Sequence, residues 1–318
     1  MRLVLILLVL AIVAGGAVLY GLYQTDIAVA RALVEGRSRT VETSFGTMNY
    51  AEQGAGPPLL VVHGAGGGFD QAFDSAGALA ANHRIIAPSR FGYLGSAVPP
   101  NASAEMQADA FVDLLDRLGI EKVSVLGISA GAMSAIEFAI RHPDRITKLA
   151  LLVPAAYSPT RVPGGGTLGG SVVEGIMRTL LGSDFMFWAG VRFFPGAMTG
   201  MILATDPELV RAASPDDQAR ASMTLHHILP ISPRIDGLVY DGIAVSTAHP
   251  PPAFDKITCP VLAISAKDDR YGTADTVTYI AGHVANARIM TFDTGGHVMI
   301  GHNAEVLRMI GDFVDAVS

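Results

Sequence analysis

The sequence predicts an α/β domain with a mostly parallel central sheet, helices on both faces and a preceding transmembrane helix. Short apolar runs alternate with segments of helical pattern along most of the chain, which indicates strand-helix-strand units. Two of these runs end in glycine-rich turns, at residues 63–68 and 127–131. Half of the 318 residues are apolar, enough for a sizeable core. We therefore expect one large folded body and no second independent domain.

Composition excludes some function classes. The formal net charge is -7 and no basic cluster is present, so a nucleic acid would find nothing to hold its phosphates. The single cysteine, Cys259, cannot form an internal disulfide, and its place at the start of an apolar run predicts a buried side chain. We expect neither a nucleic-acid partner nor a disulfide framework.

The N-terminal segment predicts a membrane anchor. Residues 3–23 carry no charge, and at about 1.5 Å per helical residue they can cross a hydrocarbon core of about 30 Å. A signal peptide has a shorter apolar core, of about 7–15 residues, so we expect an uncleaved anchor over residues 1–25 and a membrane location. The alternative is cleavage near residues 14–17. We expect the anchor to project without a role in the core and residues 26–39 to form a linker or short helix. Arginines flank both ends, so the side of the membrane stays open.

The elements of the first half follow from their patterns. Alternation over residues 40–53 with Gly46 at its centre predicts a hairpin. The glycines at 64–68 lack the order of a nucleotide-binding loop. Further expected elements are strands over 59–62, 84–87, 123–126 and 149–153 and helices over 103–118 and 132–141.

The alternation lapses between about residues 155 and 254, which is too long for a simple connection. We expect a helical cap insertion over the strand ends. Most of its aromatic and methionine side chains should form its own core, with a substrate-facing or membrane-facing role for some as the alternative; they are Phe185, Met186, Phe187, Trp188, Val191, Phe193, Phe194, Met198 and Met201. Strands over 260–265 and 287–292 and helices over 274–283 and 303–317 complete the pattern.

The motif Gly-Ile-Ser-Ala-Gly at residues 127–131 predicts a nucleophile. A strand that enters a helix through so tight a turn needs glycines at both flanks, and the turn exposes the hydroxyl of Ser129 at the end of the sheet. The alternative is a chance glycine-serine loop. A serine needs a base and an orienting carboxylate, and the sequence supplies an aspartate and then a histidine at later strand ends.

Five motifs in this order make the chain resemble the α/β-hydrolase superfamily from about residue 40 to residue 318. They are His63-Gly64, residues 90–96 (RFGYLGS), residues 127–131 (GISAG), residues 266–269 (AKDD) and residues 295–297 (GGH). The resemblance implies an α/β-hydrolase fold over residues 40–318, including the cap.

The resemblance also implies the site residues. Ser129 corresponds to the nucleophile, His297 to the general base and Asp269 to the acid, with the neighbouring Asp268, expected to face solvent, as the alternative acid. The oxyanion would be bound by the backbone N–H groups of Ala130 and of Ala65, with Gly66 as the alternative to Ala65.

The other histidines do not suggest a further site. His63 is expected to brace the glycine loop, and His302 to begin the last helix. His226 and His227 are adjacent and face different directions on a helix, and the sequence holds no metal-binding motif. We expect neither metal nor cofactor.

The expected function is hydrolysis by a Ser-His-Asp triad through an acyl-enzyme. The resemblance implies a carboxylesterase or lipase that cleaves esters, with thioesters, lactones and carbon-carbon bonds of acyl substrates as alternatives. The apolar cap favours a small hydrophobic acyl substrate. A non-catalytic, membrane-anchored binding protein of the same fold is the competing hypothesis. The oligomeric state is left open.

Overall fold

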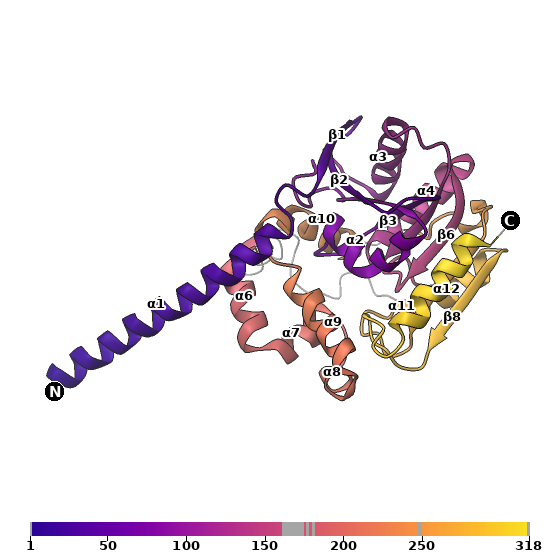
Figure 1. Ribbon diagram of the computed structural model, residues 1–318. Helices are drawn as coiled ribbons and strands as arrows, with labels where there is room; N and C mark the ends of the chain where they lie inside the picture. Colours follow the sequence, from indigo (N-terminus) through magenta and orange to yellow (C-terminus); the bar gives the residue numbers. More distant parts are fainter. Residues whose placement is uncertain (1, 161–174, 176–177, 180–181, 247–249, 317–318) are drawn as a thin grey trace.

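The computed structural model describes residues 2–160, 175, 178–179, 182–246 and 250–316 and is built around an eight-stranded sheet (Figure 1). The strand order is β1-β2-β4-β3-β5-β6-β7-β8. The strands are β1 (Arg39–Thr43), β2 (Gly46–Gln53), β3 (Pro58–Val62), β4 (Arg84–Pro88), β5 (Val123–Ile128), β6 (Ile146–Leu152), β7 (Val261–Ala266) and β8 (Ala287–Phe292).

The first two strands form the predicted hairpin. Gly46 supplies the positive φ of 103° at the turn, and β2 then runs antiparallel to β4. The remaining pairs are parallel, from β4 through β3, β5, β6 and β7 to β8. The carboxyl ends of these parallel strands therefore meet at one edge, where ligands of such sheets bind.

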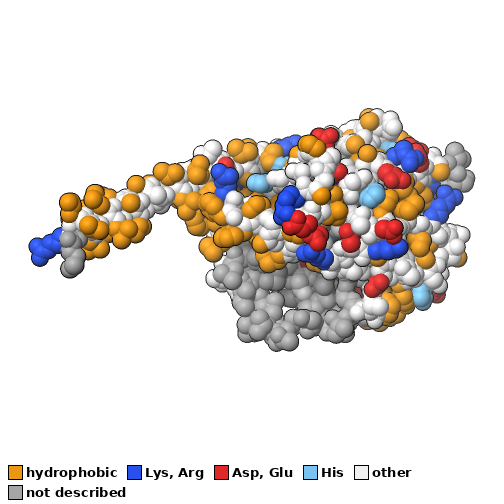
Figure 2. Space-filling view, turned by 90° about the horizontal axis from the view of Figure 1, so that it is seen from below, with side chains coloured by type: hydrophobic (Ala, Val, Ile, Leu, Met, Phe, Trp, Pro, Cys, Tyr) orange, Lys and Arg blue, Asp and Glu red, His pale blue; other side chains and the backbone are white. Residues whose placement is uncertain are grey.

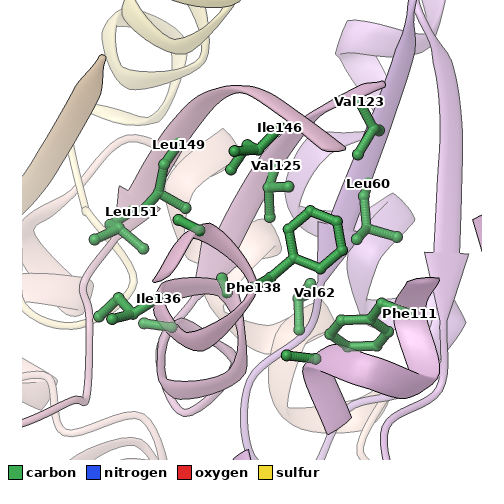
Figure 3. Packing of buried hydrophobic residues seen from close by; sticks show 14 of the residues in the cluster. Leu60, Val62, Phe111, Val123, Val125, Ile136, Phe138, Ile146, Leu149 and Leu151 are labelled. Carbon is green, nitrogen blue, oxygen red and sulfur yellow. The ribbon is translucent and has the colours of Figure 1, made fainter. Parts of the chain in front are cut away.

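Helices cover both faces, as the fully apolar strands predict. In β3, Leu60 and Val62 face the cluster that contains Phe111 and Ile136, whereas Leu59 and Val61 face the opposite cluster. Figure 3 shows the first of these clusters. One face is covered by α3 (Ala104–Arg117), α4 (Gly131–Arg141) and α11 (Thr273–His283), and the other by α2 (Phe69–Ala76) and α12 (Asn303–Asp315).

Between β6 and β7 the described chain forms the expected helical cap. Its helices are α6 (Asp184–Phe193), α7 (Pro195–Ile202), α8 (Pro207–Ala212), α9 (Pro215–His226) and α10 (Ile235–Ser246). The sequence begins several of them with clear caps. Asp206 and Ser214 each precede a proline and accept a backbone N–H of the first turn.

The apolar side chains of the cap divide into two sets. A buried cluster contains Phe187, Trp188, Val191 and Met198, as expected of a cap core. A second set is half or more exposed, as the alternative of an outward-facing role for some of them allows: Met186, Phe193, Phe194 and Met201.

Two buried ion pairs connect the cap to the sheet domain. Arg90, after β4, donates two hydrogen bonds to Asp241 of α10, at 2.8 and 2.6 Å. Arg234 of the cap makes an equivalent bidentate pair with Asp70 at the start of α2 and donates two hydrogen bonds, at 3.0 and 2.6 Å. Such paired geometry compensates the cost of burying two charges and fixes the orientation of the partners.

The N-terminal helix α1 (Arg2–Ala32) is long and apolar enough to cross a membrane, and it projects from the body (Figure 1). It continues without a break through residues 26–32, the first part of the segment for which a linker or short helix was expected. Ile27 and Ala30 are buried in the cap cluster, and Leu19 and Tyr23 pack against it. The expectation that residues up to 23 have no role in a core therefore fails for their last turn, because the cap offers that turn an apolar surface.

Candidate active site

Ser129 lies in a strained turn between β5 and α4. Its φ is 51°, a conformation that non-glycine residues rarely adopt. The flanking glycines are required, since a Cβ at Gly127 would lie 2.6 Å from the Cβ of Ala135 and one at Gly131 would lie 2.4 Å from the carbonyl oxygen of His63. The turn therefore holds the hydroxyl at the carboxyl edge of the sheet.

The structure brings Ser129, His297 and Asp269 into one hydrogen-bonded chain. His297 Nε2 lies 2.9 Å from Ser129 Oγ, and His297 Nδ1 lies 2.8 Å from Asp269 Oδ2. The histidine follows β8 and the aspartate follows β7, so both stand at the same sheet edge as the serine. With Nδ1–H donated to the carboxylate, Nε2 is left to accept the serine proton.

Asp269 is held in the ionised form that this arrangement requires. Burial by itself would raise its pKa, but hydrogen bonds from His297, from Thr273 Oγ1 and from the backbone N–H of Tyr271 together hold the pKa below its ordinary value of 3.8. Thr273 begins α11, so the helix start supplies one of these donors.

Asp268 does not face solvent as expected. Its two carboxylate oxygens accept the backbone N–H groups of Gly295 and Gly296, at 3.2 and 2.8 Å. The neighbouring acids thus divide two tasks, because alternate residues after a strand point in different directions. Asp269 contacts the His297 ring, and Asp268 holds the turn before it.

The predicted oxyanion donors border the serine. Ala130 is the N-terminal capping residue of α4, where helix N–H groups favour negative charge. No hydrogen bond within the described residues uses the N–H of Ala130 or of Ala65. The N–H of Gly66, by contrast, donates to Tyr93 Oη at 3.3 Å, which favours Ala65 as the second donor.

His63 is buried beneath this loop. The backbone N–H of Arg90 donates to its Nε2 at 2.8 Å, so the hydrogen-bond network assigns the proton to Nδ1, which donates to the carbonyl oxygen of Gly64. Burial, reinforced by the positive charge of Arg90, lowers the pKa of His63 well below its ordinary value. The neutral ring braces the glycine loop, as the sequence predicted.

Two contacts with the base were not foreseen from the sequence. Thr205, in the cap, accepts the backbone N–H of His297 on its Oγ1 at 3.0 Å. The ring of Tyr271 meets the His297 ring edge-to-face with centroids 4.9 Å apart, and its hydroxyl donates to the carbonyl oxygen of Ile202 in the cap. Neither residue belongs to a motif, so the sequence carried no signal for them.

His227 and His302 each have a structural partner away from the candidate triad. His227 Nδ1 lies 2.6 Å from a carboxylate oxygen of Asp74, and His302 stacks on Phe292 at the start of α12. Among the described residues, no three His, Cys, Asp or Glu side chains form a group that could hold a metal ion.

A cavity of about 1160 Å³ opens beside α4 and α10. Its described lining includes Met133 of α4, Ala156 after β6 and Tyr240 of α10, but none of the three triad side chains. The lining residue Ala156 is nevertheless adjacent in sequence to Ala155, which donates its N–H to the carbonyl oxygen of Ser129 at 3.0 Å.

Comparison with known proteins agrees with this fold. A family model described as the alpha/beta hydrolase fold matches residues 57–166. The 2-hydroxymuconate semialdehyde hydrolase of Pseudomonas sp. (strain CF600) is 29% identical over 84% of this chain and 89% of its own. An alpha/beta hydrolase fold protein from Nakamurella multipartita superposes with a TM-score of 0.71 at 24% identity, over 86% of this chain and 98% of its own. A bacterial membrane phospholipase A has a TM-score of 0.63 at 21% identity, over 99% of this chain and 98% of its own.

Proposed function

The chain belongs to the α/β-hydrolase superfamily, and we propose that it is a serine hydrolase that cleaves carboxylic esters through an acyl-enzyme. The observation that carries this proposal is the continuous chain from Ser129 Oγ through His297 to Asp269, with separations of 2.9 and 2.8 Å. Each link has the length of a working hydrogen bond without any rearrangement.

The proposed reaction begins with attack of Ser129 Oγ on the acyl carbon. His297 Nε2 takes the hydroxyl proton, and Asp269 stabilises the resulting imidazolium. The oxyanion is held by the N–H groups of Ala65 and Ala130, which are preorganised in the glycine loop and at the α4 start. The protonated His297 then gives its proton to the leaving group, and a water molecule activated by the same nitrogen hydrolyses the acyl-enzyme.

The substrate class is proposed from the surroundings. The buried cap cluster is apolar, and the cavity beside α4 is large enough for an acyl chain with its leaving group. The cavity wall also carries Glu105, Glu137, Arg178 and Asp236, so it is the apolar cap cluster that favours an uncharged, hydrophobic ester. The name of the Pseudomonas relative gives a small semialdehyde as its substrate, so cleavage of related acyl compounds is the alternative chemistry to test beside esters.

We also propose that α1 anchors the enzyme in a membrane. Residues 3–22 have the length for a hydrocarbon core of about 30 Å. The structure of the membrane phospholipase A aligns with 99% of the chain, α1 included.

Hydrolysis of p-nitrophenyl esters of graded acyl length by the full-length protein in detergent tests the ester proposal. The wild type should turn over the longer esters, and Ser129→Ala should be reduced to the background rate. Equal rates for wild type and Ser129→Ala with every ester would contradict the proposal that this triad hydrolyses esters.

A further inference from the structure

The exposed apolar side chains of the cap form a second surface without an assigned role. Its members are Met186, Phe193, Phe194 and Met201, which have exposed fractions between 50% and 67%. We call them the α6–α7 surface. All four belong to two consecutive cap helices, and several large exposed apolar groups on one element indicate a contact site, since singly scattered ones are ordinary.

The α6–α7 surface lies beside the point where α1 enters the body. In Figure 1, α6 begins beside the base of α1 and runs away from it, α7 follows at the far end of α6, and β8 and α12 lie on the opposite side of the body. Figure 2 shows hydrophobic side chains that cover α1 and continue onto the body around its base. The body around the base of the helix proposed to cross the membrane is therefore apolar, and α6 begins beside that base.

Specific contacts fix α6 at this level of α1. Trp188 Nε1 donates to Asp26 Oδ2 at 2.8 Å, and Arg31 lies 3.6 Å from the carboxylate of Asp184. The ring of Tyr23 packs edge-on against Trp188, with centroids 5.5 Å apart. The cap helix therefore cannot slide along α1 without breaking polar and aromatic contacts.

The same contacts place α6 at the boundary of the bilayer. The uncharged run of α1 ends just before Asp26, where the charge must leave the hydrocarbon. Tyr20 and Tyr23 occupy the preceding turn, and tyrosine and tryptophan are enriched at this depth. The end of α6 carries Arg192 and Phe193, and Phe194 joins α6 to α7; all three are exposed, a combination that suits lipid phosphate and acyl chains together.

From this placement we infer that the α6–α7 surface inserts into the headgroup and acyl boundary of the same bilayer that α1 crosses. The inference rests on the proposed anchor. It gives the cap a lipid partner, and it brings α7 to the membrane only three residues before Thr205, the cap residue that contacts the His297 backbone.

Site-specific quenching in the full-length protein tests the inference. An environment-sensitive fluorophore is attached to Phe194→Cys or Met201→Cys, and the protein is reconstituted in phosphatidylcholine vesicles with and without a lipid that carries a spin label near the headgroup. Ile289→Cys on β8 is the matched control, because Ile289 is also an exposed apolar side chain, at 44%, but lies away from α1. Wild type serves as the blank, since Cys259 is buried and burial raises the pKa of its thiol to about 11.

Spin-labelled lipid should reduce emission at positions 194 and 201 by about twofold or more, because an inserted surface lies about 5–10 Å into the boundary, and it should leave position 289 unchanged. Emission at 194 and 201 that the lipid does not quench would overturn the inference. This includes blue-shifted emission without quenching, which would mean that protein, such as a second copy of the chain, covers the surface.

A fourth position separates the inference from the anchor. Val13→Cys, in the middle of the apolar run, should be quenched by a spin label deep in the acyl chains if α1 spans the bilayer. Quenching at position 13 without quenching at positions 194 and 201 would contradict the insertion of the α6–α7 surface and would still support the anchor. Quenching at 194 and 201 without quenching at 13 would refute the anchor and would also overturn the inference as stated, because the surface would then touch lipid without a bilayer crossed by α1.

Discussion

Thr205 Oγ1 accepts the backbone N–H of His297 at 3.0 Å, so a residue of the cap holds the loop that carries the base. Thr205 is completely buried, and its hydroxyl donates in turn to the carbonyl oxygen of Leu203. The cap therefore does more than cover the strand ends, because its position sets the position of the triad.

Replacement of Thr205 tests this coupling. Thr205→Val keeps the shape but removes the acceptor for the His297 N–H. We expect kcat to fall by up to about 10²-fold, the order produced by small displacements of catalytic groups. The matched control is Thr224→Val on α9, where the hydroxyl donates only to the carbonyl oxygen of Arg220 within its own helix. Equal kcat values for the two variants would mean that the cap does not position the base.

The two neighbouring acids should respond differently to amidation. Asp269→Asn presents a donor to His297 Nδ1 and favours the wrong tautomer, so kcat should fall by about 10⁴-fold with the fold retained. Asp268→Asn loses one of the two carboxylate oxygens that accept backbone N–H groups. Its kcat should fall less, because the imidazole of His297 keeps its partner. Steady-state kinetics with circular dichroism as the folding control decide the ranking. The reverse order would make Asp268 the acid.

The buried pair between Arg90 and Asp241 should matter for stability. Asp241→Asn leaves the Arg90 charge buried with weaker compensation, so the free energy of unfolding should fall by about 3–5 kcal/mol. The control is Asp312→Asn, which removes an exposed pair with Arg308 on α12 and should change stability by less than about 1 kcal/mol. Denaturant unfolding measures both. Similar small changes in both variants would show that the buried pair does not hold the cap.

The contact between His227 and Asp74 predicts a pH dependence of stability. The hydrogen bond to Asp74 raises the pKa of His227 above its ordinary value of 6.5, although partial burial opposes this. A raised folded pKa contributes stability that is fully present below 6.5 and is lost as pH rises through the folded value. His227→Gln should therefore be less stable than wild type at about pH 6 and should approach it at about pH 9, where the histidine is neutral in both states. Asp74→Asn should remove the same pH dependence. Parallel unfolding profiles for wild type and both variants would contradict this assignment.

The candidate triad could be predicted because each member lies in the turn after a parallel strand, and because the resemblance to the α/β-hydrolase superfamily implies the nucleophile, acid and base at these turns. A parallel sheet places these turns at one edge, and the strand order β5-β6-β7-β8 in the structure brings them together. Thr205 could not be foreseen, since its contact joins residues 92 positions apart and the cap follows no periodic pattern.

The N-terminal helix shows a similar limit. Its length and lack of charge were evident from composition, but its contact with the cap depends on Asp26 and Trp188, which are 162 residues apart. Helix α2 was not predicted either. It begins directly after the glycine run, and Gly68 before it has an extended backbone and provides no side-chain cap that would mark a helix start in the sequence. Local sequence patterns thus predicted the sheet and the edge where the site lies. The positions of the cap and of α1 depend on contacts between residues far apart in the sequence, which local patterns do not predict.

The central claim is that Ser129 is an activated nucleophile, and covalent labelling tests it most directly. The full-length protein is treated with a fluorophosphonate at neutral pH, and the modified residue is identified by peptide mass spectrometry. We expect a single adduct on Ser129, which is absent in Ser129→Ala and forms much more slowly in His297→Gln. A wild-type protein that takes up no reagent, or that is modified on another serine with Ser129 untouched, would contradict it.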